Sequence, residues 1–193
     1  ITASDTVITC TRQQIVLDGT RSTPLGQVMY RWEDNMGNPI SDSSHYVVTK
    51  PDTYYLQVIT TQSLCAQRVR IIIAADTLKP VINISGLDTL DCRTSRITLR
   101  AGNSTNLANP IYRWATSGTG RIEGATDRDS AIVSGPGFYN LQIDNARNGC
   151  SANANIQVIQ NTSPPIAIAG GGGTITCTNT NITLSGAGSS QGA

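Results

Sequence analysis

The stretch NPIYRWATS, residues 109–117, contains the tripeptide Tyr112-Arg113-Trp114, and the same three residues occur at Tyr30-Arg31-Trp32. The chain has 193 residues and only two tryptophans, so both tryptophans stand in the same short context. The two copies are 82 positions apart (from 30 to 112). A rare residue that recurs in this way indicates an internal repeat, and a repeat constrains the fold more than any other sequence feature.

The rest of the chain repeats in the same register, with a shift of 82 before the tryptophans and 85 after them. The matched pairs include Cys10 and Cys92, Leu17 and Leu99, Tyr54 and Tyr139, Cys65 and Cys150, and Cys92 and Cys177. The sequence therefore predicts repeat 1 over 1–76, repeat 2 over 77–162, and the start of a third repeat over 163–193. The third segment lacks a Tyr-x-Trp motif, and the chain opens on Ile1, so we expect a window of a longer protein.

The composition favours a β protein and excludes several functional classes. Charged residues make up 14% of the chain, well below the roughly one quarter of an average globular protein. The net charge is +1 and the basic residues are dispersed, which gives no electrostatic case for binding nucleic acid or an anionic membrane. Thr, Ile, Val, Asn, Ser and Gly are abundant, as is typical of short strands joined by turns.

Short alternating stretches predict where the strands lie. TVITC, QIVLDG, MYRWED, TYYLQVIT and RVRIIIAA are separated by turn residues, giving about seven strands in each repeat. The predicted fold class is all-β, with tandem immunoglobulin-like Greek-key β-sandwiches arranged end to end.

The aromatic residues predict the core of each sandwich. The tyrosine and tryptophan of YRW are two positions apart and share one strand face, so we expect Tyr30, Trp32, Tyr112 and Trp114 to pack between the sheets. An aromatic platform for a ligand is the alternative. Tyr54 and Tyr139 stand at strand entrances, where a corner tyrosine can bond back to the backbone.

The five cysteines predict one disulfide in each repeat. The repeat register favours bridges Cys10–Cys65 and Cys92–Cys150, with Cys177 as the first half of a third bridge whose partner lies beyond the chain end. No CxxC motif occurs and the chain has one histidine, which argues against a zinc site. Disulfides predict an extracellular location.

No motif indicates catalysis. A catalytic triad needs a nucleophile, a base and a residue that orients the base. The adjacent residues Asp42, Ser43, Ser44 and His45 are too close in sequence for this arrangement, and repeat 2 has no counterpart. AGGGGT, residues 169–174, is not followed by the Lys-Ser/Thr of a phosphate loop. We expect no enzyme, no catalytic or metal-ligating residue and no cofactor. Calcium stays open as an alternative at Asp127-Arg128-Asp129 and at Asp34-Asn35 with Asn38, although polar turns also explain both clusters.

Together these motifs resemble a known class of repeat. The pattern P-x(11)-C, L-x-G-x-x-S, Y-x-W, P-G-x-Y-x-L-x-V and N-G-C resembles the tandem repeats of giant cell-surface adhesins of Bacteroidota, of which the SprB-like gliding-motility adhesins are the best known. Those repeats are similar to PKD-like and other immunoglobulin-like modules. The resemblance is clear at Cys92, Tyr112, Trp114, Pro136, Gly137, Tyr139 and Cys150, whereas repeat 1 has Asp52 in place of Gly and SLC in place of NGC.

The resemblance implies a location, partners and a modification. It implies type IX secretion to the cell surface, gliding motility, and repeats that contact neighbouring repeats or identical chains in a homo-oligomeric fibre. It implies a surface or cell-envelope ligand at the tips, with no nucleic acid and no membrane insertion of this segment. Sequons of the form Asp-Ser/Thr-apolar, which that phylum O-glycosylates, occur at Thr6, Thr77, Thr89 and Ser130.

We therefore expect a non-enzymatic structural repeat of a large secreted adhesin or appendage, such as a stalk, fibre or hook, that attaches to surfaces or other cells. The alternative is a carbohydrate-binding or accessory immunoglobulin-like module of a secreted multidomain enzyme. Tyr46 and Phe138 are the candidate exposed aromatics for that alternative.

Overall fold

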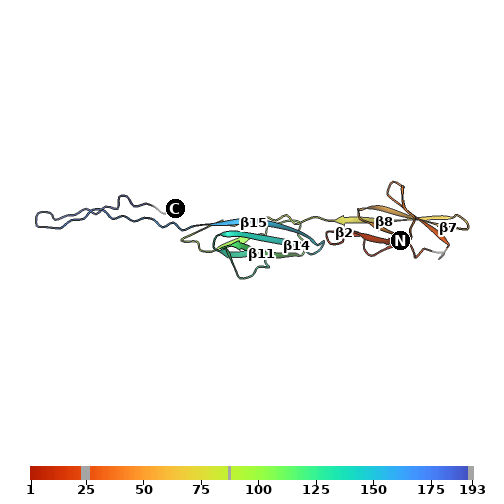
Figure 1. Cartoon of the computed structure of the whole chain (residues 1–193), viewed down its shortest axis with the longest axis horizontal. Coiled ribbons are helices and arrows are strands. Elements are labelled where there is room, and N and C mark those ends of the chain that lie inside the picture. Colours follow the sequence, from red (N-terminus) through yellow and green to blue (C-terminus); the bar gives the residue numbers. More distant parts are fainter. Residues whose placement is uncertain (23–26, 87, 191–193) are drawn as a thin grey trace. The chain divides into compact units, whose positions relative to one another are not determined.

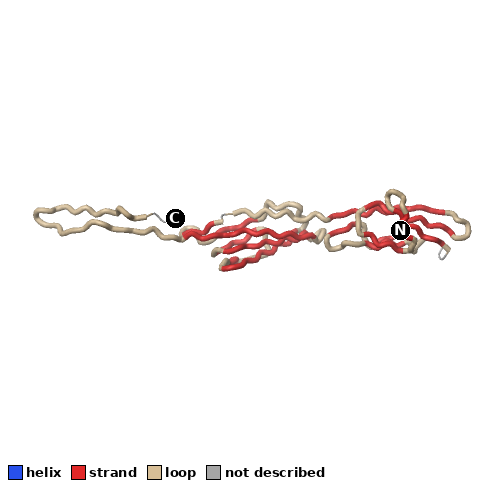
Figure 2. The backbone as a smooth tube through the Cα atoms, turned by 45° about the horizontal axis from the view of Figure 1, so that its top comes forward, coloured by secondary structure: helices blue, strands red, loops and turns tan. Residues whose placement is uncertain are grey.

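The computed structural model describes residues 1–22, 27–86 and 88–190, and all regular secondary structure in them is β-strand (Figure 2). The predicted all-β class is therefore confirmed. These residues include no helix, and so none long and apolar enough to cross a bilayer. The last three positions of the predicted third repeat, 191–193, lie outside the described residues.

The chain divides into two compact units that cut across the predicted repeats. Unit 1 comprises Ile1–Val81, Thr105–Ile111 and Ile143–Ala152. Unit 2 comprises Ile82–Ser104, Tyr112–Gln142 and Asn153–Ala193. Three short segments of repeat 2, residues 77–81, 105–111 and 143–152, therefore pack with repeat 1, which is the arrangement that forms the site described below.

Unit 1 contains a three-stranded sheet, β1-β3-β6, and a five-stranded sheet, β2-β8-β7-β4-β5. The strands are β1 (Thr2–Ala3), β2 (Val7–Thr9), β3 (Ile15–Asp18), β4 (Val28–Glu33), β5 (Pro39–Ser41), β6 (His45–Val48), β7 (Asp52–Thr60) and β8 (Ala66–Asp76). The antiparallel strands β7 and β8 lie side by side (Figure 1). Strand β2 pairs with β8 in parallel, with Val7 opposite Ala74 and Thr9 opposite Asp76. Strand β2 therefore lies beside the C-terminal end of β8.

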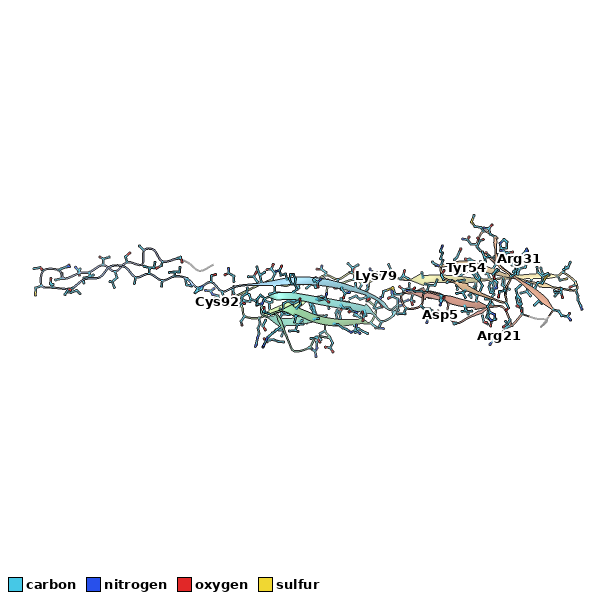
Figure 3. All side chains as sticks on the ribbon, in the orientation of Figure 1. Asp5, Arg21, Arg31, Tyr54, Lys79 and Cys92 are labelled. Atoms are coloured by element: carbon cyan, nitrogen blue, oxygen red, sulfur yellow. A yellow bond between two sulfur atoms is a disulfide. The ribbon has the colours of Figure 1, made fainter. Side chains whose placement is uncertain are left out.

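The core of unit 1 is built around the first YRW. Trp32 is fully buried and its indole N–H donates to the carbonyl of Ser43 at 2.8 Å. Its ring stacks on Tyr46 with the centroids 6.2 Å apart, and Tyr46 in turn contacts Tyr54 at 5.9 Å. Arg31, between the two inward-facing aromatics of the motif, is exposed; Figure 3 labels it together with Tyr54. The other buried members of this core are Ile8, Ile15, Leu17, Val48, Leu56 and Ile73.

The second set of strands has a similar plan, with sheets of three and four strands. The sheets are β10-β13-β12 and β11-β14-β15-β9. The strands are β9 (Thr89–Asp91), β10 (Ile97–Arg100), β11 (Pro110–Gly118), β12 (Arg121–Glu123), β13 (Ser130–Ser134), β14 (Gly137–Asn145) and β15 (Cys150–Asn161). Trp114 is 5% exposed and donates to the carbonyl of Arg128 at 2.9 Å. Strand β9 pairs in parallel with the end of β15, Asp91 lying opposite Asn161, as β2 does with β8.

The segment after β15 repeats the first pairings of repeat 2. Residues 163–190 contain no named strand but have two isolated bridges. These bridges are Ile166 with Ser190 and Gly170 with Ser185, and at a shift of 85 they correspond to Val81 with Thr105 and Ser85 with Arg100. The repeat register found in the sequence is thus also a register of backbone contacts.

Two tyrosines, Tyr54 and Tyr139, lie near the start of a strand and bond through their hydroxyls to the backbone. The hydroxyl of Tyr139 donates to the carbonyl of Gly135 at 2.8 Å and accepts from the N–H of Arg121 at 3.0 Å. The hydroxyl of Tyr54 donates to the carbonyl of Lys50 at 3.0 Å. Burial raises the pKa of both phenols above the ordinary value. Each tyrosine thus ties its strand to a carbonyl four residues upstream.

The two tyrosines give a paired prediction. Tyr139→Phe should lower the free energy of unfolding by about 2 kcal/mol, because the part-buried Arg121 N–H and Gly135 carbonyl both lose a partner. Tyr54→Phe removes one donated bond and should cost about 1 kcal/mol. Urea denaturation of both variants measures the difference, and a larger loss for Tyr54→Phe would contradict this account.

Candidate functional site

The structure joins Cys10 to Cys150, with an S–S distance of 2.00 Å and a Cα–Cα distance of 5.0 Å. Both residues belong to unit 1. Cys65, Cys92 and Cys177 are exposed and unpaired. This bond replaces the predicted bridges Cys10–Cys65 and Cys92–Cys150, and it links residues of two successive sequence repeats.

The pairing of β2 explains why the predicted bridges do not form. Cys65 immediately precedes the 11-residue strand β8, whereas Cys10 follows β2, which pairs with the last residues of β8. A strand rises about 3.3 Å per residue, so β8 separates the two cysteines by roughly 35 Å. A disulfide requires Cα atoms within about 7 Å. Cys92 and Cys150 lie at opposite ends of the 12-residue strand β15 for the same reason.

We call the disulfide, the Cys10 turn (residues 9–12) and the Cys150 hairpin (residues 145–150) the staple. In the turn, the N–H of Thr9 donates to the carbonyl of Arg12 at 2.9 Å, and the N–H of Arg12 donates to Thr9 Oγ1 at 3.1 Å. The N–H of Cys10 is thereby directed outward and donates to the carbonyl of Asn148 at 3.1 Å. A backbone hydrogen bond therefore accompanies the covalent one.

The hairpin depends on a glycine. The N–H of Gly149 donates to the carbonyl of Asn145 at 2.8 Å, and Gly149 has φ 69°. A Cβ atom at Gly149 would overlap the side chain of Thr11 in the facing turn. Glycine is the residue that combines a left-handed conformation with so close an approach of two backbones.

Two buried asparagines fix the hairpin; they are the buried polar residues within the described ranges. Asn148 is 1% exposed, and its Nδ2 donates to Asp76 Oδ1 at 2.8 Å and to the carbonyl of Leu78 at 3.0 Å. Its Oδ1 accepts from the N–H of Cys150 at 3.0 Å. The Nδ2 of Asn145 donates to the carbonyl of Asn106 at 3.2 Å. Buried side-chain polar atoms without a partner are absent from the described part of the chain.

The segment between the two repeats is hydrogen-bonded at several positions. Besides the bonds from Asn148 to Asp76 and Leu78, the Nδ2 of Asn106 donates to the carbonyl of Lys79 at 3.3 Å. Val81 pairs with Thr105. An ion pair between Arg147 and Asp76 at 3.8 Å is exposed and adds little. The connection is therefore held by short-range contacts in addition to the disulfide.

Replacing Asn148 tests how much its side-chain hydrogen bonds contribute to the stability of the staple. Asn148→Ala should lower the free energy of unfolding of unit 1 by about 3 kcal/mol, because the part-buried Leu78 carbonyl and the buried Cys150 N–H lose their partners. The matched control is Ser63→Ala at the equivalent position of the exposed hairpin of repeat 1, with an expected effect within about 0.5 kcal/mol. Chemical denaturation measures both, and equal effects would contradict the assigned role.

The fold places one further polar residue, Asp18, beside His45. The Oγ of Ser44 lies 3.0 Å from His45 Nδ1, and His45 Nε2 lies 3.4 Å from Asp18 Oδ1. Asp18 is distant from His45 in the sequence, so no local motif pointed to it; the pairing of β3 with β6 places it opposite His45. Hydrogen bonds from the Thr20 side chain and backbone lower the pKa of Asp18. The imidazole is half exposed to water, and we assign no catalytic role to this line.

The candidate calcium ligands in repeat 1 form a turn. The Asp34 carboxylate accepts from the N–H groups of Met36 and Asn38 at 2.9 and 2.8 Å and from Asn38 Nδ2 at 2.9 Å. These bonds, from Asn38 first, lower the pKa of Asp34. Within 1–22, 27–86 and 88–190, no three His, Cys, Asp or Glu residues are placed to hold a metal ion. Calcium at Asp34-Asn35 with Asn38, or at Asp127-Arg128-Asp129, stays an untested alternative to the expected absence of a cofactor.

The predicted sequons differ in exposure. Thr6 and Thr77 are exposed, and Thr77 lines a hollow beside the staple together with Thr11 and Gly149. Thr89 on β9 is half-buried and its hydroxyl donates to Asp88. Ser130, on β13, is also half-buried. Glycosylation at these positions stays a prediction, and the exposed pair offers the easier access.

The candidate ligand-binding aromatics lie in different environments. Tyr46 is half-buried against Trp32 and Tyr54 in the core of unit 1. Phe138 on β14 is 54% exposed. Only Phe138 of this pair therefore presents its ring to solvent.

No protein-family model and no curated protein matches the chain. Among solved structures, three N-terminal domains of the bacteriophage RB49 highly immunogenic outer capsid protein align at 10% identity and a TM-score of 0.46, covering 96% of this chain and 67% of that one. A 282-residue C-terminal fragment of intimin aligns at 11% identity and 0.41, covering 86% and 65%. Murine CEACAM1b aligns at 9% and 0.38, covering 82% and 97%. These likenesses are distant, and the fold assignment rests on the strand order of this chain.

Proposed function

We propose that this chain is a non-enzymatic structural segment of a secreted cell-surface adhesin or appendage, in which its repeats hold distant binding parts away from the cell. The observation that carries the proposal is the staple, because a covalent bond and a set of buried hydrogen bonds join residues of two successive repeats. A connection of this kind resists bending and pulling, which a spacer needs and a catalytic domain does not.

Two further features support the proposal. Structural disulfides persist in oxidising compartments, so the Cys10–Cys150 bond favours a location outside the cytosol. Each repeat has its own buried tryptophan, Trp32 or Trp114, so each brings a core of its own to a string of similar modules. A repetitive string with self-contained cores gains length simply by adding copies.

The finer assignment rests on the sequence motifs. The Y-x-W, P-G-x-Y and N-G-C motifs resemble the repeats of SprB-like adhesins of Bacteroidota, and we extend the proposal to a type IX secreted adhesin of that class, with gliding motility as its setting. O-glycosylation at Thr6 and Thr77, the two exposed sequons, belongs to this finer proposal.

One observation favours a second candidate. The exposed ring of Phe138 could stack on a sugar, as expected of a carbohydrate-binding module attached to a secreted enzyme. Titration of the chain with a panel of oligosaccharides distinguishes the two, because binding that Phe138→Ala abolishes would favour the module over the spacer.

The test of the leading proposal uses intact cells of the source organism. Antibodies raised against this chain should label extended structures outside the cell in immunogold electron microscopy, and deletion of the gene should lower attachment to surfaces at least tenfold. Labelling only after cell lysis, or unchanged attachment of the deletion strain, would overturn it.

A further inference from the structure

Both halves of the staple recur elsewhere in the chain. The Cys10 turn has equivalents around Cys92, labelled in Figure 3, and around Cys177. In each turn the residue before the cysteine donates its N–H to the carbonyl three positions later: Thr9 to Arg12 at 2.9 Å, Asp91 to Thr94 at 3.1 Å and Thr176 to Asn179 at 2.9 Å. In each, the side-chain oxygen of that first residue also accepts backbone N–H groups of the turn.

The Cys150 hairpin recurs around Cys65. The N–H of Leu64 donates to the carbonyl of Thr60 at 3.0 Å, as the N–H of Gly149 does to Asn145 at 2.8 Å. Leu64 has φ 55°, close to the 69° of Gly149, although a leucine is strained in this region. Repeat 1 therefore keeps the hairpin conformation although leucine disfavours the positive φ at this position.

The equivalents share the backbone conformation of the staple, but their cysteines are unpaired, and the Cys65 hairpin has Ser63 and Leu64 where the staple has Asn148 and Gly149. Cys65 and Cys92 are exposed, and Leu64 is 69% exposed, whereas Cys150, which is bonded to Cys10, is fully buried. The Cys10–Cys150 bond is thus an observed complex of one turn and one hairpin, and the chain presents a second turn and a second hairpin of the same kind.

We propose that the Cys92 turn and the Cys65 hairpin form the same kind of turn-to-hairpin disulfide, without the Asn148 and Gly149 contacts of the staple, with another repeat of the class, which a second copy of this chain can supply. The rule is that the first cysteine of one repeat bonds the second cysteine of the next. A turn meets a hairpin and not its own equivalent, so the contact is heterologous and extends head to tail. The inference needs only the staple and does not rest on the proposed function.

The chemistry is ordinary thiol–disulfide exchange. The thiolate of Cys92 attacks a small-molecule or protein disulfide, which releases one thiol and leaves a mixed disulfide on Cys92. The thiolate of Cys65 from the partner copy then attacks the Cys92 sulfur and displaces the second thiol. Two cysteine thiols are oxidised, the external disulfide is reduced to two thiols, and the protons of both cysteines pass to the released thiolates.

A run of such staples would limit how far the chain can be stretched. The backbone from Cys150 to Cys177 spans 27 positions (150 to 177), as does that from Cys65 to Cys92 (65 to 92). A covalent path from Cys10 to Cys177 through the disulfide uses only those 27 positions, about 95 Å when fully extended. The full backbone between the same residues would reach about 580 Å. Pulling could then not unravel whole repeats.

The test uses the full chain in two complementary variants, each with the Cys10–Cys150 bond intact. One carries Cys65→Ser and Cys177→Ser and offers only the Cys92 turn, and the other carries Cys92→Ser and Cys177→Ser and offers only the Cys65 hairpin. Each variant alone, and the two mixed, are incubated near millimolar concentration, comparable to a tethered neighbour, in a glutathione redox buffer. Non-reducing peptide mapping then identifies the bridges.

The expected result is a Cys65–Cys92 bridge in the mixture at a yield at least tenfold above that of the Cys65–Cys65 or Cys92–Cys92 bridges in the separate samples. Equal yields of the three bridges would show that the thiols react without recognition and would overturn the proposal. A mixture that forms no bridge while Cys10–Cys150 stays oxidised would overturn it as well.

Discussion

Cys150→Ser is expected to destabilise unit 1 more than any other single cysteine replacement. The bond that it removes closes a loop with a sequence separation of 140 residues. In the loop-entropy model, losing a constraint of this length costs about 5 kcal/mol of unfolding free energy. The fully buried position of Cys150 adds a second cost, because serine introduces a hydroxyl where a sulfur was packed.

The control for this variant is Cys65→Ser, at the equivalent position of repeat 1. Cys65 is exposed and unpaired, so its replacement should change the unfolding free energy by no more than about 0.5 kcal/mol. Urea denaturation without reductant measures both. A large loss for Cys65→Ser with none for Cys150→Ser would contradict the staple.

Trp32→Ala is expected to unfold the sandwich of unit 1. The side chain is fully buried, stacks on Tyr46 and donates to the Ser43 carbonyl, so truncation leaves a large cavity and an unpaired carbonyl. Tryptophan-to-alanine changes in cores cost about 3–5 kcal/mol. That is a large share of the 5–15 kcal/mol that stabilises a typical domain.

The chain offers a direct readout and a control for this change. With Trp32 removed, Trp114 is the only tryptophan, and its fluorescence reports unit 2 while far-UV circular dichroism reports both units. Met29→Ala, on the same strand but 46% exposed, should cost about 0.5 kcal/mol or less. If Trp32→Ala were as mild as Met29→Ala, YRW would not be a core motif.

The repeated motifs predicted much of the fold because alternation in a strand is a local property. Tyr and Trp two positions apart must share a face, and the structure buries Trp32 and Trp114 while exposing Arg31. The backbone hydrogen bond of Tyr139 could likewise be predicted from its position near the start of a strand, and its hydroxyl donates to the Gly135 carbonyl.

The disulfide partner was not predictable from the repeat register alone. A period of about 85 residues fixes which cysteines are equivalent, and it is satisfied both by bridges within repeats and by bridges between successive repeats. The choice depends on β2 pairing in parallel with the far end of β8, a long-range contact without a local signal. The length of RVRIIIAA was the available clue, because a long strand directly after Cys65 carries the chain away from that cysteine.

The central claim is the Cys10–Cys150 bond, and non-reducing peptide mapping of the native chain, alkylated before digestion, tests it most directly. With trypsin, the account predicts that peptide 1–12 is joined to peptide 148–193, with Cys65, Cys92 and Cys177 alkylated. Peptide 1–12 joined instead to peptide 32–68, which contains Cys65, would contradict it and restore the bridge within repeat 1.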